Sequence, residues 1–451
     1  MKMLSKLVKQ KGDGVLLIQK IFFGSLFFGL LPQTSVGWAS PGSLPPSEKP
    51  PSANWLGTLP PSTPESGKPD CGSVFVQAAL SAVLYTHLQG GQVQFPEPMA
   101  EPSPFVLWDS TLTLRTSGGY NSNPSLAFQS EARHPAAFFE YGGDLLFFRL
   151  PTDGDTASIF LSGDDRRYFS NEDVPGQQNF LSQFSYEHES PSWWNAGGNL
   201  IWMYANQVVD LSELGAYPKG PEQVQGNTVI FRPNFSGRIG TNWLAGIELP
   251  LTYQGLSVAP DGFLEAGPQL LLTRRLRNGS TASIGYSWSE RVYSTATPLL
   301  TPGGEVINPV TLVVEHLQLN TVNGKWQQYW DREKQWRTTL SSGFTTARDN
   351  GTGYYNYNRF RVGAGIQANL GRWILSLDGA ASWYQYTEQT SAPEESTLRD
   401  RQEYSVGLQA SYEITDHVRS FVRFSWETSI ANTPQDNYGA TTSAAGFEFE
   451  F

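Results

Sequence analysis

The sequence is poor in cysteine and in charged residues. Its one cysteine, Cys71, cannot form a disulfide within the chain, and it excludes the paired cysteines of redox motifs and zinc sites. Charged residues make up 16% of the chain, against about 25% in a typical soluble domain. The net charge of -11 leaves no dominant basic face, so nucleic acid is not an expected partner.

Long apolar runs are also lacking outside the N-terminal residues. Beyond residue 40 we find no uncharged apolar stretch of about 18 residues, the length that a transmembrane helix needs. Aromatic residues instead reach 13%, although mean hydropathy is negative. A chain that is rich in aromatics, poor in charge and hydrophilic on average is unlike a helical membrane protein.

The N-terminal residues have the order of an export signal. Five lysines precede or interrupt the apolar run that ends at residue 31, and small residues suited to cleavage follow near Ala39. This order predicts a signal peptide over residues 1–39, with an uncleaved transmembrane helix as the alternative. Residues 40–104 are rich in proline and predict a periplasmic linker with one short helix at 73–89.

From about residue 105 the sequence alternates between apolar and polar residues. The segments "EYSVGLQASYE" (403–413) and "RFRVGAGIQANL" (359–370) each keep this alternation throughout. Segments of about ten residues can cross a bilayer as tilted β-strands. Their apolar faces tend to end in aromatics, such as Tyr404 and Tyr412, as the aromatic girdles of membrane barrels do.

The connections between these segments alternate between long and short. Residues 105–451 therefore predict an all-β fold, a closed antiparallel transmembrane β-barrel of about 16 strands, within a range of about 14 to 18. The short connections are expected to be periplasmic turns and the long ones extracellular loops. Two connections fit poorly, because 255–261 is short for a loop and 320–332 is long for a turn.

The polar face of such a barrel must point inward, since an arginine facing lipid costs about 2 to 4 kcal/mol at the bilayer midplane. Inward-phase charges would set a local field and act as a selectivity filter. The alternative is that they are ordinary solvated or mutually paired lumenal residues. The pore-lining candidates are Arg232, Arg238, Arg337, Arg359, Arg361, Arg419, Arg423, Glu140, Asp144, Asp378 and Glu403. Asp164 and Asp165 follow a strand expected to end at residue 162, and they are candidates for a constriction loop.

The last residues, "AAGFEFEF", place Phe447, Phe449 and Phe451 on one side of an extended backbone and Glu448 and Glu450 on the other. With the signal sequence and the alternating pattern, this ending resembles Gram-negative outer-membrane β-barrels. The resemblance implies that the three phenylalanines are read by the barrel-assembly machinery. It also implies a place in the cell outer membrane, among its lipid and lipopolysaccharide, and a last strand that pairs with the first.

The stretch "GGYNSNP" (118–124) is similar to a Gly-Tyr-Asp-Ser-Asn motif of the family called putative β-barrel porins and of barrels linked to exopolysaccharide export. It departs from that motif by Asn121 in place of Asp. The resemblance implies a porin-like channel for passive diffusion of small hydrophilic solutes or ions. The alternative is an export conduit, or an assembly or anchor barrel, for polysaccharide or surface components.

Two further classes of protein remain open, a hydrolase and a secreted soluble β-protein. A hydrolase in the barrel wall would need a nucleophile paired with one of the five histidines, which their spacing does not indicate. A secreted soluble β-protein would bury its aromatic faces between sheets. The sequence carries no P-loop, dinucleotide fingerprint or zinc pattern, so we expect no catalytic residue, cofactor or metal. A homo-oligomer is left open.

Overall fold

The computed structural model describes residues 108–451 apart from 128, 130–132, 153, 172, 210–221, 258–261, 277–278, 308–309 and 393. The signal peptide, the linker with its helix at 73–89 and Cys71 lie outside the described residues. None of the helices in the described part of the chain has the length and apolar character of a transmembrane span.

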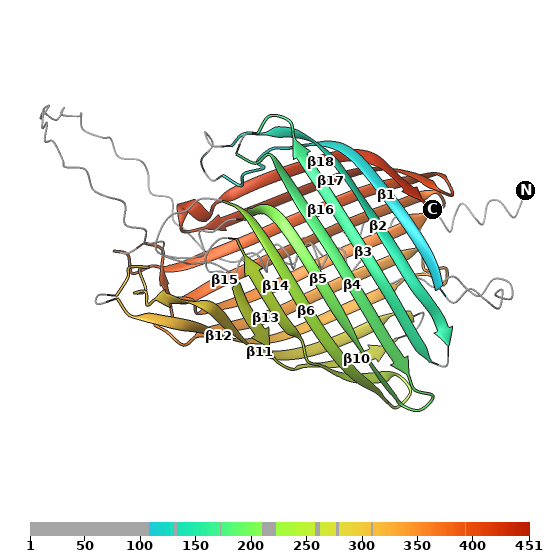
Figure 1. The fold of residues 1–451 in the computed structure, drawn as a ribbon, viewed down its shortest axis with the longest axis horizontal. Coiled ribbons are helices and arrows are strands. Elements are labelled where there is room, and N and C mark those ends of the chain that lie inside the picture. Colours follow the sequence, from blue (N-terminus) through green and yellow to red (C-terminus); the bar gives the residue numbers. More distant parts are fainter. Residues whose placement is uncertain are drawn as a thin grey trace, which may run out of the picture. The chain divides into compact units, whose positions relative to one another are not determined.

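The described strands form one antiparallel sheet that closes on itself, because β1 pairs with β18 (Figure 1). A short 3-10 helix, Pro434–Asp436, precedes the last strand. The strands are β1 (Trp108–Asn121), β2 (Ala136–Thr152), β3 (Asp155–Tyr168), β4 (Gly176–Glu189), β5 (Trp194–Val209), β6 (Glu222–Ile239), β7 (Trp243–Glu248), β8 (Leu251–Leu256), β9 (Gly262–Ala266), β10 (Gln269–Arg275), β11 (Thr281–Pro298), β12 (Leu312–Tyr329), β13 (Trp336–Asp349), β14 (Tyr357–Leu370), β15 (Trp373–Thr390), β16 (Leu398–Thr415), β17 (Val418–Ala431) and β18 (Tyr438–Glu450).

Two wall strands are interrupted at prolines. Only Leu249 and Pro250 separate β7 from β8, and only Gly267 and Pro268 separate β9 from β10. Proline has no N–H to donate to the ladder, so the strand breaks there. Because β6 pairs with both β7 and β8, and β11 with both β9 and β10, each broken pair continues as one wall strand. The 18 segments thus make 16 wall strands, and the expected closed barrel is confirmed.

Short and long connections alternate around the barrel, and they define two ends. We call the end that carries the short connections, such as 371–372 between β14 and β15, the turn end, and the opposite end the loop end. The segment 320–332, which was long for a turn, lies mostly within a strand. β12 continues to Tyr329, so the turn consists of residues 330–335. The other one, 255–261, is a short connection at the loop end, since β8 ends at Leu256 and β9 begins at Gly262.

The constriction-loop prediction for Asp164 and Asp165 is wrong about their location. Both residues lie inside β3, which continues to Tyr168. Asp164 pairs with Gly142 of β2, and Asp165 with Tyr141. The strand continues past residue 162 because backbone pairing with both neighbours persists there, although the apolar alternation that marks lipid-facing strands has ended.

The outer face of the wall is apolar. Val422, Phe360 and Phe447 point outward and have exposed fractions of 58%, 46% and 47%. Aromatic rings contact one another across neighbouring strands near both ends of the apolar band, Phe360 on Trp383 and Trp373 near Tyr412. An exposed band of this kind bounded by aromatics is the surface that a membrane barrel offers to lipid.

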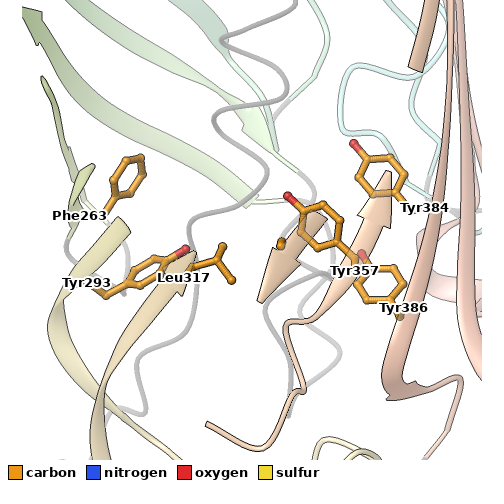
Figure 2. Packing of buried hydrophobic residues seen from close by; sticks show 7 residues of the cluster. Phe263, Tyr293, Leu317, Tyr357, Tyr384 and Tyr386 are labelled. Atoms are coloured by element: carbon orange, nitrogen blue, oxygen red, sulfur yellow. The ribbon is translucent and has the colours of Figure 1, made fainter. Parts of the chain in front are cut away.

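The inner face is partly apolar, which the sequence did not indicate. Figure 2 shows the rings of Phe263 and Tyr293 on one side and those of Tyr357, Tyr384 and Tyr386 on the other. These residues are at most 7% exposed. They belong to β9, β11, β14 and β15 near the loop end, so this part of the barrel interior is packed by side chains. A second inward cluster contains Ile201, Met203 and Ile230.

Candidate functional site: the lumenal charges

The strand registers fix which side chains face the lumen, because residues directly opposite each other in a sheet point to the same face. Ser117 pairs with Glu140, and Glu140 pairs with Arg166. Following the registers around the barrel places all eleven pore-lining candidates on this same inner face. Asp164 also faces inward. Asp165 faces outward, where it accepts hydrogen bonds from Tyr141 and Arg167.

One group of these charges is clustered near the closing pair β1 and β18. Arg423 Nη2 on β17 donates to Glu140 Oε1 on β2 at 2.8 Å, and Arg166 Nε donates to Glu140 Oε2 at 2.7 Å. Arg115 on β1 pairs with Asp144, and its Nη2 lies 3.1 Å from Asp164 Oδ1. These groups are hydrogen-bonded ion pairs, so each charge is largely compensated by its neighbours.

Arg419 extends this group toward the turn end. Its two terminal nitrogens lie 3.2 Å from Glu448 of β18 and 3.3 Å from Glu413 of β16. Glu448 therefore faces inward, and its carboxylate has a cationic partner. We call Arg115, Glu140, Asp144, Asp164, Arg166, Arg419, Arg423 and Glu448 the seam network.

A second group lies among the buried rings near the loop end. The guanidinium of Arg291 stacks 4.2 Å from the Phe263 ring centre and lies 2.7 Å from Glu265. Arg359 Nη1 is 3.5 Å from the Tyr384 hydroxyl, which donates to Glu403 at 3.2 Å. Arg359 and Glu403, both pore-lining candidates, thus belong to a packed part of the wall.

The buried pair Arg399 and Asp436 ties the loop between β17 and β18 to β16. Arg399 Nη2 donates to Asp436 Oδ2 at 2.6 Å, and both side chains are at most 2% exposed. Arg401, fully buried, lies 3.0 Å from Glu403. Removing one partner of a buried ion pair leaves an uncompensated charge, so these contacts hold the loop end together.

Two candidates lie elsewhere in the wall. Arg232 on β6 is 3.9 Å from Glu248 on β7. Arg238, at the turn end of β6, lies 2.8 Å from Glu189, and both side chains are more than half exposed. An exposed pair of this kind contributes little to stability.

A third group stands on strands β12, β14 and β15 and has small neighbours. Arg361 is opposite Gly343 and Ser382, and Asp378 is opposite Gly365 and Gly407. Lys325 is opposite Ser283 and Ser341. All three side chains therefore have only glycine or serine directly opposite them on the adjacent strands. We call Lys325, Arg361 and Asp378 the lumenal strip. Arg337, nearby on β13, donates to the neutral amide of Gln367.

Several charged residues of the interior were missed by sequence reasoning. Lys325 lies in a segment assigned to a turn, although the alternation of Thr321, Asn323, Lys325 and Gln327 with Val322 and Trp326 was a usable signal. Arg115 and Arg166 lie on strands whose polar face carries both signs of charge. Nothing in the sequence indicated that Arg399 and Asp436 would pair, because the end of β16 and the loop before β18 come together only in the folded barrel.

The histidines do not form a hydrolytic site among the described contacts. His188 lies 2.7 Å from Asp155, and His316 lies 2.9 Å from Glu290. Both pairs are on the outer face by register, and no described serine or threonine hydroxyl is bonded to either imidazole. Within the described residues, no three His, Cys, Asp or Glu side chains are placed to hold a metal ion.

The last third of the barrel carries a family signature. Residues 322–451, from within β12 to the end of β18, match the family model "Putative beta-barrel porin 2". The resemblance read from the sequence is confirmed. This matched stretch contains the whole lumenal strip and Arg337, as well as the seam residues Arg419, Arg423 and Glu448. No curated protein matches the chain.

Solved structures similar to this chain include outer-membrane proteins of several bacteria. OccAB1 of Acinetobacter baumannii matches with a TM-score of 0.40 and 8% identity, over 76% of this chain and 96% of that one. The anion-selective porin of Comamonas acidovorans has a TM-score of 0.38 and 8% identity, over 76% and 99%. OpdQ of Pseudomonas aeruginosa has a TM-score of 0.37 and 9% identity, over 76% and 98%.

Proposed function

We propose that this protein is an outer-membrane channel through which small hydrophilic solutes or ions diffuse passively. The two-faced wall carries this proposal. Its outer face is a band of exposed apolar side chains bounded by aromatics, and its inner face carries most of the charged residues. Such a wall is stable only when lipid covers the outside, and it leaves the polar face toward the enclosed space.

Within this channel, the lumenal strip supplies the local field that a passing ion meets. Lys325 and Arg361 bring two positive charges to neighbouring regions of β12 and β14, while Asp378 brings one negative charge on β15. The residues directly opposite these three side chains on the adjacent strands are glycine and serine, so the neighbouring strands present only small side chains at these positions. Charged side chains lining a pore set its preference for anions or cations.

Reversal potentials under a salt gradient test this assignment. Replacing Lys325 and Arg361 together by glutamine should shift the reversal potential of the reconstituted protein toward cations, and Asp378→Asn should shift it toward anions. Arg274→Gln is the matched control, because Arg274 is on the outer face against Trp243. Unchanged reversal potentials in both lumenal variants would remove the lumenal strip from the filter.

Deletion of residues 41–100 separates a simple channel from an export conduit. A passive channel should still insert and conduct after this deletion, because its wall begins only at β1. A conduit that receives its cargo through a periplasmic partner should keep its barrel but lose transport. Retained insertion without any ion conductance, in both full-length and shortened protein, would contradict the channel proposal.

A further inference from the structure

The seam between β1 and β18 is the weakest part of the backbone ladder around β1. Thr113 to Asn121 pair with Glu450 to Thr442, which makes nine pairs, whereas β1 pairs with β2 over fourteen. These strands lie at opposite ends of the barrel sequence, so bringing them together carries the largest loop-closure cost of any pair in the wall. The seam therefore needs contacts beyond its own ladder.

The seam network supplies such contacts on the lumenal side. Arg423 reaches from β17 over β18 and β1 to Glu140 on β2, so one side chain bridges the strands on both sides of the seam. Arg166 on β3 grips the other oxygen of the same carboxylate. Glu140 is only 13% exposed. A charge-assisted bond in this shielded position is stronger than one at the surface.

Small residues under Arg423 make this reach feasible. The residue opposite Arg423 on β18 is Ala444, and Gly446 of β18 is opposite Ser117 of β1. A Cβ added at Gly446 would lie 2.1 Å from the Thr116 carbonyl oxygen, and one at Gly119 would lie 2.3 Å from that of Ser443. The two seam strands thus approach each other closely and leave the lumenal side clear for the guanidinium.

The motif "GGYNSNP" forms a second set of contacts at the loop end of the seam. Ser122 donates its N–H to the Thr441 carbonyl at 2.9 Å and accepts from the Thr441 N–H through its hydroxyl at 2.8 Å. The buried amide of Asn123 donates to the Gly439 carbonyl at 3.2 Å. Asn121 donates to the Tyr168 hydroxyl of β3 at 3.2 Å.

The turn end of the seam is held by the last residues. Leu112 and Phe451 exchange backbone hydrogen bonds of 3.1 and 2.9 Å. The contacts thus occur at the loop end, at the middle and at the turn end of a single strand pair.

We propose that the seam network and the motif at 118–124 together form a clasp that closes the barrel between its first and last strands. Arg423 and Glu140 then act in closure and stability, and ion selection is left to other lumenal charges. The inference rests on the barrel fold alone and does not depend on the proposed channel activity.

The test compares Arg423→Gln with Arg232→Gln. Arg232 is a matched control, since its side chain is 36% exposed against 37% for Arg423 and its ion pair joins two consecutive wall strands. Folded barrels migrate faster on gels before boiling, so the temperature at which this fast form disappears measures stability. Arg423→Gln should lower this temperature by several degrees and speed hydrogen exchange in residues 112–121 and 442–451, whereas Arg232→Gln should do neither.

If Arg423→Gln fails to assemble, an engineered disulfide across the seam provides a second test. Tyr120 and Ser443 are directly opposite across the seam, so Tyr120→Cys with Ser443→Cys, in a Cys71→Ser background, should restore the fast-migrating form when oxidised. Equal loss of stability in both arginine variants, or exchange that rises in β5 and β6 as much as at the seam, would overturn the clasp. A shift in reversal potential with unchanged stability would assign Arg423 to the filter.

Discussion

The guanidinium of Arg423 lies 2.8 Å from the carboxylate of Glu140, although these residues are 283 positions apart in the chain. Two strands, β18 and β1, separate them around the wall. Glu140 also forms an ion pair with Arg166 of β3, so this single carboxylate compensates two cations. The contact joins side chains from the first and the last part of the barrel sequence.

Glu140→Gln should therefore destabilise the barrel more than Arg423→Gln does. The glutamine leaves two partly buried guanidinium groups without a carboxylate, and breaking a buried pair in this way costs about 3 to 5 kcal/mol. Denaturant unfolding in lipid vesicles, followed by tryptophan fluorescence, measures the difference. Glu395→Gln is the control and should change little, because Glu395 is an exposed loop position whose carboxylate accepts a hydrogen bond from the Ser391 hydroxyl. An equal effect of Glu140→Gln and Glu395→Gln would refute the shared-carboxylate account.

Asn123→Ala should weaken the loop end of the seam. The fully buried amide exchanges hydrogen bonds with Ala127 and donates to the Gly439 carbonyl. Its truncation leaves these backbone groups unsatisfied, at about 1 to 3 kcal/mol. Asn432→Ala removes two comparable bonds at an exposed position and should cost less. The temperature at which the fast-migrating folded form disappears on a gel measures the stability of the two variants. A larger loss of stability for Asn432→Ala than for Asn123→Ala would contradict the assigned role of the motif.

Two arginine substitutions on β17 test which face of the wall contacts lipid. Val422→Arg places a charge on the exposed outer face, where lipid contact costs about 2 to 4 kcal/mol near the midplane. Ser425→Arg adds the same residue on the inner face, three positions along the strand. Insertion into outer-membrane lipid vesicles should fall for Val422→Arg and persist for Ser425→Arg. The reverse order would mean that the inner and outer faces are exchanged.

The period of two predicted the strands of the wall, because a strand with lipid on one side and a polar lumen on the other alternates strictly. It failed where that constraint ends. Strand β3 continues through Asp164 and Asp165 in a segment that carries polar residues on both faces, and β12 continues to Tyr329 in a segment where Gly324 and Gln328 interrupt the apolar outer face. The apolar interior around Phe263 and Tyr357 was also missed, since inward aromatics are indistinguishable in sequence from girdle residues.

The partners of the charges could not be predicted, although their face could. Strand register follows from the alternation only as a choice between two faces, whereas Arg423 finds Glu140 through closure of the whole sheet. Similarly, Arg399 meets Asp436 only because a loop folds back on β16. The phenylalanines at 447 and 449 lie on a strand that pairs with β1 as expected. Their recognition by an assembly machinery stays a prediction.

Single-channel conductance in planar bilayers tests the central claim most directly. Full-length protein, shown to be folded by its fast migration before boiling, should produce discrete conductance steps that decrease when small neutral polymers enter the lumen. Polymers above a cut-off size should leave the steps unchanged, which gives the bore. Folded and inserted protein that produces no conductance steps at any voltage would contradict the assignment of this barrel as a passive channel.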